Sequence, residues 1–288
     1  MHTIALYNNK GGVGKSTLTL FMADFLASLT VAGRLLRVLV IDLDAQGSSS
    51  TALLGDEKGR QARAADLSIG HLALQLAEGG RPALEPFLLL RPRSRSGHPP
   101  LPAITVLLPE RESIFNFDAN PLQSLTLLSH TLKPLLEQIF DIVLLDLPGN
   151  LDERHLLAIN GLVMSDSIVI PMEPTRLAIH ALPETLRMIR YAQGKNRRGT
   201  PTLLGIVLNR TDRRSRQFHL HVPEMVQFLE QTGTPCFANC LPNAPELANA
   251  TDDTLAFTSL KDRYGGYYPH VKKVVKELFD RWQQAPLG

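Results

Sequence analysis

The chain has 288 residues, of which 44% are hydrophobic and 20% are charged, and its formal net charge is +2. This composition is typical of a soluble globular protein with a sizeable core, and the small net charge excludes nucleic-acid binding through overall charge alone. The two cysteines, Cys236 and Cys240, lack the further ligands of a zinc site, so we expect both to be reduced and in or near the core. The sequence begins without a signal-peptide pattern and has no apolar run of the ~18 residues needed to cross a bilayer, which predicts a cytoplasmic protein.

Short apolar segments predict the strands of a mostly parallel sheet, because nearly continuous apolar runs are typical of strands that helices cover on both faces. The predicted strands are Ile4–Tyr7, Leu36–Ile41, Ile104–Leu108, Ile142–Leu145, Ser167–Met172 and Leu203–Leu208. Apolar residues at helical spacing predict helices over Leu18–Leu29, Leu122–Phe140, Leu177–Tyr191, Val222–Gln231 and Tyr268–Trp282. The alternation of the two patterns predicts an α/β fold with a doubly wound sheet and helices on both faces.

One segment interrupts this alternation. Residues 78–102 are rich in proline, glycine and arginine, which indicates a loop or an insertion. Strands and helices resume after it, so we expect residues 1–288 to form a single domain.

The strongest motif is Lys10-Gly11-Gly12-Val13-Gly14-Lys15-Ser16-Thr17, between the predicted strand Ile4–Tyr7 and the helix Leu18–Leu29. Its three glycines allow backbone N–H groups to turn inward, and these groups and the helix N-terminus attract phosphate. Lys15 is expected to reach the β- and γ-phosphates, and the Ser16 hydroxyl is expected to bind Mg²⁺. A strand, this loop and a helix together predict a P-loop nucleotide site.

The motif resembles the deviant Walker A box of the ParA/MinD family, although Asn9 stands at the nominal first glycine of the general P-loop pattern. The resemblance implies that all eight residues of the motif bind ATP with Mg²⁺, and that Lys10 crosses a homodimer interface to the partner's nucleotide. It also implies slow ATP hydrolysis that a ParB-like or other adaptor protein stimulates. An additional cation near the phosphates would favour the charge that develops during phosphoryl transfer.

Two carboxylates follow the second predicted strand, and residues just beyond such strands face the ligand crevice. The segment Asp42–Gly47 resembles the family's D-x-D-P-Q-G box, with Ala45 in place of proline. The resemblance implies that Asp44 orients or deprotonates the attacking water and that Asp42 supports the Mg²⁺ shell. An alternative for Asp44 is a helix N-cap, because serines and a threonine follow at 48–51.

A third carboxylate, Asp146, directly follows the predicted strand Ile142–Leu145 and is expected to hold Mg²⁺ through water. Gly149 follows it and could offer its N–H to the γ-phosphate and act as a hinge. The segment Asp146–Gly149 also fits the D-x-x-G pattern of GTPases, and Asn209-Arg210-Thr211-Asp212 is one residue from a guanine-reading motif. The resemblance favours ATP, with Asn209 meeting the adenine, and leaves a GTPase switch as an alternative.

Basic residues late in the chain are candidates for DNA binding, because ParA proteins bind DNA without sequence preference through such residues. They form two clusters, 195–198 and the arginines Arg210, Arg213, Arg214 and Arg216, and the residues expected to contact DNA are Arg197, Arg198, Arg213, Arg214 and Arg216. An alternative is a solvated charged loop. We expect an ATPase that partitions plasmid or chromosomal DNA and associates with the nucleoid. The competing hypothesis is a MinD-like membrane-surface ATPase, for which the amphipathic segment His270–Trp282 would lie on a membrane. Packing of that segment on the body is favoured, so a membrane is the less expected partner.

Overall fold

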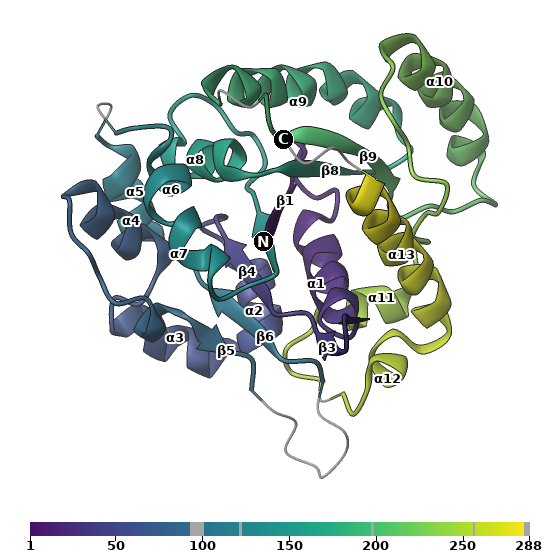
Figure 1. Cartoon of the computed structure of the whole chain (residues 1–288). Coiled ribbons are helices and arrows are strands. Elements are labelled where there is room, and N and C mark those ends of the chain that lie inside the picture. Colours follow the sequence, from purple (N-terminus) through teal and green to yellow (C-terminus); the bar gives the residue numbers. More distant parts are fainter. Residues whose placement is uncertain (93–100, 121–122, 197–198, 256, 285–288) are drawn as a thin grey trace.

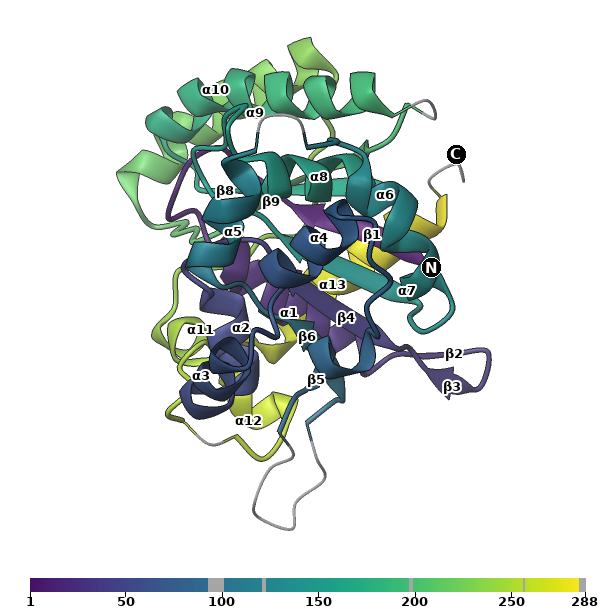
Figure 2. The same ribbon diagram turned by 90° about the vertical axis from the view of Figure 1, so that its left-hand side faces the viewer.

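The computed structural model describes residues 1–92, 101–120, 123–196, 199–255 and 257–284 (Figure 1). Its main sheet has seven strands in the order β5-β6-β4-β7-β1-β8-β9, and every neighbouring pair is parallel except β5 with β6. The strands of the sheet are β1 (His2–Leu6), β4 (Val38–Asp42), β5 (Leu89–Leu90), β6 (Ile104–Leu107), β7 (Ile142–Asp146), β8 (Ser167–Met172) and β9 (Thr202–Leu208). A small hairpin of β2 (Thr30–Val31) and β3 (Arg34–Leu35) projects from one side of the molecule (Figure 2).

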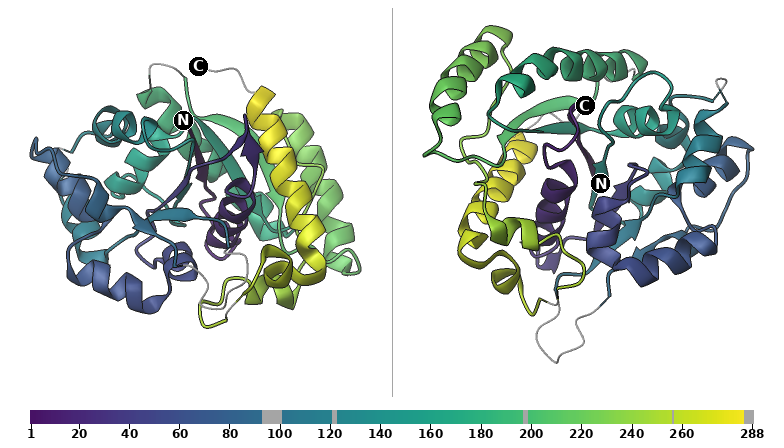
Figure 3. Two further views of the ribbon diagram at one scale, coloured as in Figure 1. Left: turned by 60° about the horizontal axis from the view of Figure 1, so that its bottom comes forward. Right: turned by 180° about the vertical axis from the view of Figure 1, so that it is seen from behind.

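Helices cover both faces of the sheet, and each face has its own hydrophobic core (Figure 3). The first core is formed with α4 (Ile69–Ala77), α5 (Arg111–Asp118), α6 (Leu127–Thr131), α7 (Lys133–Glu137), α8 (Leu156–Met164), α9 (Arg176–Lys195) and α10 (Arg216–Thr232). The second is formed with α1 (Lys15–Leu26), α2 (Ser48–Leu54), α3 (Asp56–Ala64), α11 (Pro245–Asn249), α12 (Leu260–Tyr264) and α13 (Tyr268–Gln284). The predicted doubly wound α/β fold is therefore confirmed.

Each predicted strand coincides with an observed one to within two residues at each end, as continuous apolar runs allow. The predicted helix over 122–140 is wrong as one element, because α6 and α7 are separate five-residue helices. Pro134 stands in the first turn of α7, where a proline is compatible with a helix start but not with the interior of a longer helix. The apolar patterns did not predict α2 to α5, α8, α11, α12, β5 or the β2–β3 hairpin.

The segment 78–102 contains structure of its own in its described part. A short 3-10 helix, η1 (Glu85–Phe87), leads into β5, which adds an antiparallel edge strand to β6. Arg91 then turns into the protein, where its buried guanidinium pairs with Asp24 of α1. Residues 93–100 lie outside the described part of the chain.

The last helix, α13, packs on the body of the protein beside α1 and β9 (Figure 3). Its apolar stripe is buried, and it consists of Val271, Val274, Val275 and Leu278. Arg281 adds hydrogen bonds to the carbonyls of Leu204 and Cys236, so the C-terminal half of the helix is fixed by polar contacts as well. In the described parts of the chain, no helix has both the length and the apolar character needed to span a membrane.

Candidate functional site

The glycine-rich loop connects β1 to α1, as expected from the motif. Gly12 and Gly14 have φ angles of 76° and 88°, in the left-handed region that glycine adopts without strain, and Gly14 caps α1. The N–H groups of Val13 and Gly14 donate to no acceptor among the described residues. The loop therefore presents unpaired donors at a helix N-terminus, which is the arrangement that binds phosphate.

Lys15 lies inside this loop rather than extending into solvent. Its Nζ donates to the carbonyl oxygens of Asn8 at 3.2 Å and Lys10 at 3.1 Å. Burial lowers the pKa of Lys15, and the carboxylates of Asp146 and Asp44 oppose that shift. The ammonium group is thus held at the loop and close to both carboxylates.

Asp146 is the least satisfied polar group in the described structure. It is fully buried at the end of β7, and neither carboxylate oxygen accepts a hydrogen bond from any described residue. The nearby Ser49 hydroxyl is also buried and unpaired. Burial and the Asp42 carboxylate raise the pKa of Asp146, whereas the hydroxyls of Ser16 and Ser49 lower it. Unpaired buried oxygens of this kind fit the oxygen-rich shell of Mg²⁺, which Asp146 and Ser16 would hold.

Asp42 lies beside Asp146 in the sheet, because the two residues are register partners of β4 and β7. Unlike Asp146, it is fully engaged by protein groups. One oxygen accepts from the backbone N–H and the hydroxyl of Ser50, at 2.9 and 2.7 Å, and the other accepts from the N–H of Asp44 at 3.1 Å. Asp42 therefore orders the loop from 44 to 50 at the edge of the site.

Asp44 stands on that loop and is half-buried. Its Oδ1 accepts from the N–H of Gln46 at 3.0 Å, and its carbonyl accepts from Gly47 at 2.8 Å. The N-cap of α2 is Gly47, with a φ of 64°, so the alternative of Asp44 as the N-cap is wrong. Its carboxylate lies close enough to Lys15 to raise the pKa of the ammonium group.

The segment after β7 touches the glycine-rich loop. The N–H of Asn150 donates to the carbonyl of Asn9 at 2.6 Å. A Cβ on Gly149 would lie 3.0 Å from the N of Gly11 and 3.2 Å from Nζ of Lys15, so glycine is required for this approach. A movement of the glycine-rich loop would therefore also displace the segment directly after β7.

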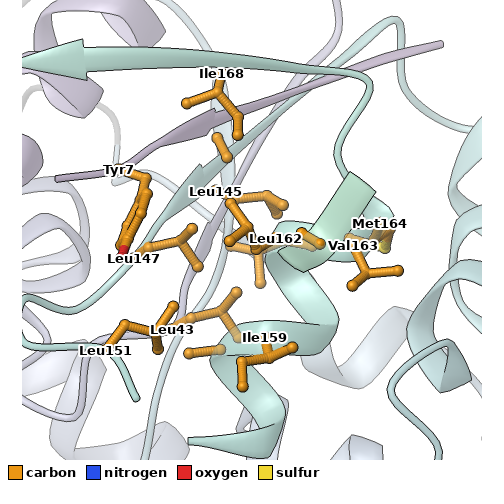
Figure 4. Close-up of a cluster of buried hydrophobic side chains, with 14 of the residues drawn as sticks. Tyr7, Leu43, Leu145, Leu147, Leu151, Ile159, Leu162, Val163, Met164 and Ile168 are labelled. Carbon is orange, nitrogen blue, oxygen red and sulfur yellow. The ribbon is translucent and has the colours of Figure 1, made fainter. Parts of the chain in front are cut away.

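A cluster of buried apolar side chains includes the residues next to two of the carboxylates (Figure 4). Leu43 and Leu147 each follow a carboxylate and point into the core against α8, where they meet Ile159 and Leu162 (Figure 4). A Cβ on Gly161 would lie 2.3 Å from Cδ1 of Leu43, so a glycine there lets the loop and the helix pack closely. The positions of Asp42 and Asp146 are consequently fixed by the hydrophobic core.

Asn209 directly follows β9 and is buried against the glycine-rich loop, where an adenine contact was expected from the sequence. Its Nδ2 donates to the carbonyl of Val13 at 2.9 Å, and its Oδ1 accepts from the N–H of Arg210 at 2.9 Å. The amide is thus engaged with the protein backbone. Arg210 itself reaches the carbonyl of Gly12 and the carboxylate of Glu173. From the sequence, Arg210 was expected only as part of the near match to a guanine-reading motif and of a basic cluster, and Glu173 was missed.

Two further residues position the loop and were also missed. Asn8 accepts from the N–H of Lys10 and donates to the carbonyl of Pro171 in β8, and Thr185 of α9 accepts from the N–H of Asn9. The hydroxyl of Thr185 also donates to Asn8. Asn8 adjoins the motif and could have been examined as its support, whereas no sequence pattern links the motif to a threonine more than 170 positions away.

The basic residues are separated by β9, the edge strand of the sheet. Arg213, Arg214 and Arg216 are exposed on the segment that follows the strand, while Arg197 and Arg198 lie outside the described residues. Lys195, the last residue of α9, precedes the strand. A strand of seven residues spans roughly 23 Å. The chain therefore enters β9 at one end of the sheet and leaves it at the opposite end, next to Arg213 and Arg214.

Comparisons with known proteins agree with this geometry. The CobQ/CobB/MinD/ParA nucleotide binding domain matches residues 4–256. The chromosome-partitioning ATPase Soj of Thermus thermophilus is 29% identical over 98% of this chain and 97% of its own length. The chain spans 61% of the length of two Pseudomonas putida proteins to which it is 32% identical over 190 residues.

Two solved structures share the fold across nearly the whole chain. One is cobyrinic acid a,c-diamide synthase of Mycobacterium smegmatis with bound ADP and magnesium, with a TM-score of 0.70, 20% identity and coverage of 98% of this chain and 95% of that one. The other is pNOB8 ParA bound to nonspecific DNA, with a TM-score of 0.68, 22% identity and coverage of 99% of each chain. The family match spans most of the chain, including the glycine-rich loop and all three carboxylates, and the chain therefore belongs to the CobQ/CobB/MinD/ParA nucleotide-binding family.

Proposed function

We propose that this protein is a Mg²⁺-dependent ATPase that acts as a nucleotide-gated switch in the partition of DNA. The observation that carries the proposal is the buried, unpaired carboxylate of Asp146 beside Lys15 and a loop with unpaired N–H donors. A carboxylate in this state favours a divalent cation, and the loop favours phosphates. The similarity to Soj of Thermus thermophilus supports partition as the biological role.

Each part of the site has a task in phosphoryl transfer. Lys15 and the loop N–H groups bind the phosphates and stabilise the charge that develops on their oxygens. Bound Mg²⁺ would neutralise phosphate charge, held by Asp146 and the hydroxyl of Ser16. Asp44 orients the attacking water or accepts its proton. Gly149 lies against Lys15, so the segment after β7 is placed to respond to the γ-phosphate.

The same proposal includes a homodimer that sandwiches ATP. Lys10 is half-buried at the start of the loop, and its carbonyl accepts from Lys15 while its backbone N–H donates to Asn8. These contacts fix the backbone and leave the side chain as the part that would reach a second subunit. An adaptor of the ParB type would then accelerate hydrolysis and release the dimer.

Hydrolysis tests the function directly. The purified full chain should hydrolyse ATP with Mg²⁺ and not with EDTA. Asp44→Ala should retain ATP binding, lose at least about 100-fold in turnover and accumulate as a dimer in light scattering, because general-base catalysis contributes roughly 10²–10⁴-fold. Asp280→Ala on the exposed face of α13 is the matched control and should behave like the wild type.

Two results would contradict parts of this proposal. Wild-type turnover in Asp44→Ala would remove Asp44 from catalysis while leaving the ATPase assignment in place. Absence of Mg²⁺-dependent ATP hydrolysis by the wild type, with and without DNA, would remove the assignment itself.

A further inference from the structure

The two residues that follow β9, Asn209 and Arg210, hold one side of the glycine-rich loop, and we call them the β9 strap. Nδ2 of Asn209 donates to the carbonyl of Val13 at 2.9 Å. Nη1 of Arg210 donates to the carbonyl of Gly12 at 2.9 Å. The strap thus binds two successive carbonyl oxygens of the loop, and it does so from a strand almost 200 positions away in sequence.

Holding these carbonyls fixes the opposite side of the same peptide groups. The Gly12–Val13 and Val13–Gly14 peptides are trans, and in a trans peptide the C=O and N–H bonds point in opposite directions. When the carbonyls of Gly12 and Val13 face the strap, the N–H groups of Val13 and Gly14 must face away from it. Those two N–H groups are the ones that donate to no described acceptor.

The strap is itself held by Glu173 and by a hydrogen bond between its two residues. Nη1 of Arg210 also contacts Oε1 of Glu173 at 3.0 Å, and the N–H of Arg210 donates to Oδ1 of Asn209 at 2.9 Å. Arg210 has a φ of 51°, in the left-handed region that is strained for a non-glycine residue. At Gly14, a Cβ would lie 2.1 Å from Nδ2 of Asn209, so only a glycine at this position leaves room for the Asn209 side chain. Sites hold strained residues where the surrounding contacts over-determine them.

We propose that Arg210, braced by Glu173, is a positioning residue for phosphate binding. With Asn209 it clamps the outward carbonyls of the glycine-rich loop so that the N–H groups of Val13 and Gly14 are aimed at the β-phosphate before nucleotide arrives. The guanidinium also polarises the Gly12–Val13 peptide, which strengthens its N–H as a donor. The inference rests on the proposed ATPase function and assigns to Arg210 a task distinct from DNA contact, although it adjoins the exposed basic loop.

The test separates phosphate binding from base binding with two probes, a non-hydrolysable ATP analogue and inorganic tripolyphosphate, each titrated with Mg²⁺ onto the full chain. Arg210→Ala should weaken both probes by the same factor, about tenfold, which is the loss expected for a charge-assisted hydrogen bond. Glu173→Ala should weaken the binding of both probes equally, and by a smaller factor than Arg210→Ala does. The matched control is Arg60→Ala, which removes another exposed arginine paired with a glutamate.

A second variant guards against loss of fold. Arg210→Gly removes the clamp and the backbone strain together, so it should melt no lower than the wild type and still bind both probes about tenfold more weakly. Unchanged binding of both probes in the two Arg210 variants would overturn the proposal, and weakening of the ATP analogue alone would assign Arg210 to the base instead. If the wild type binds neither probe, the proposed function itself fails.

Discussion

The carboxylate of Asp118 lies at the junction between α5 and α8. Its Oδ1 accepts from the N–H of Leu157 at 2.8 Å, near the start of α8. Burial raises the pKa of Asp118 to about 6, against hydrogen bonds from α8 and the charge of His155 that lower it. Because the folded pKa lies above the unfolded value, this group's contribution to stability is fully present below about pH 4 and is lost as the pH rises through about 6.

Replacement of this side chain by a neutral one should therefore stabilise the protein at neutral pH. In Asp118→Asn the amide oxygen still accepts from Leu157 and carries no charge. We expect its free energy of unfolding to exceed that of the wild type by about 1–2 kcal/mol at pH 8, a difference that partial solvent exposure of the side chain keeps small. Near pH 4 the two proteins should be equally stable. Urea unfolding at both pH values measures the difference, and a difference that is the same at pH 4 and pH 8 would show that Asp118 is not its source.

Residues of the site could be predicted where their neighbours in sequence explain them. The glycine-rich loop and the strand-ending carboxylates are local patterns, so the sequence places them at one edge of the sheet. The different surroundings of Asp42 and Asp146 could not be predicted, because they depend on the Ser50 hydroxyl turning back to Asp42. The contact of Arg210 with the glycine-rich loop could likewise not be predicted, since the carbonyl that it binds lies 198 positions earlier.

At the scale of elements, a buried cluster of charges joins three parts of the chain that cover one face of the sheet. Asp24 of α1 is fully buried and pairs with Arg91, just after β5, and with Arg263 of α12 at 3.5 Å. The hydroxyl of Tyr264 donates to the same carboxylate at 2.6 Å. Asp24 is thus the shared acceptor that fixes the β5 edge and the C-terminal helices to the helix that follows the glycine-rich loop.

Removal of this one charge should destabilise the whole fold. Asp24→Asn leaves two buried guanidinium groups without a counter-charge, and breaking a buried pair costs roughly 3–5 kcal/mol. Tyr264→Phe removes a single hydrogen bond and should cost about 1 kcal/mol. Denaturant unfolding of both variants tests the ranking, and an Asp24→Asn protein as stable as Tyr264→Phe would contradict the role of the cluster.

Elements were predictable in proportion to their length and regularity. Parallel strands and the long helices α1, α9, α10 and α13 carry strong apolar patterns, so the sequence predicts that they exist, although α10 begins at Arg216 rather than at the predicted Val222. β5 has two residues in a proline-rich segment, and its pairing with β6 depends on tertiary contacts that no local pattern reports. Arg91 adjoins a run of arginines and serines, so its burial against Asp24 was equally unpredictable.

At the scale of the whole molecule, the arrangement of α13 and the basic loop bears on the choice between DNA and membrane. The apolar stripe of α13 is buried against the body, so it is not available to enter a bilayer unless the helix detaches. Arg213, Arg214 and Arg216 are exposed at the edge of the sheet where the nucleotide site also lies. A dimer formed around ATP would therefore place the basic loops of its two subunits near the shared nucleotide sites.

DNA binding should follow from this arrangement as a property of the ATP state. The full chain should bind duplex DNA of arbitrary sequence when ATP is bound and should not bind it when ADP is bound. The single basic loop of a monomer neutralises too few DNA phosphates for stable binding. With roughly four arginines engaged across a dimer, affinity should fall about 10²-fold over a fourfold rise in salt, since log affinity falls by about 0.9 per phosphate for each unit of log salt. Arg213→Ala combined with Arg214→Ala should flatten that dependence and leave ATP turnover without DNA unchanged.

A charge-matched control distinguishes the loop from net charge. Arg60→Ala combined with Arg81→Ala removes two exposed arginines elsewhere, and it should retain both the affinity and the salt slope of the wild type. Fluorescence anisotropy over a salt series gives both quantities for each protein. The same proteins are then sedimented with anionic liposomes, where the buried stripe of α13 predicts no binding. If the ATP-bound wild type ignores duplex DNA at low salt and instead sediments with liposomes, and deletion of residues 270–288 abolishes that, the membrane-surface ATPase replaces the partition ATPase as the function of this fold.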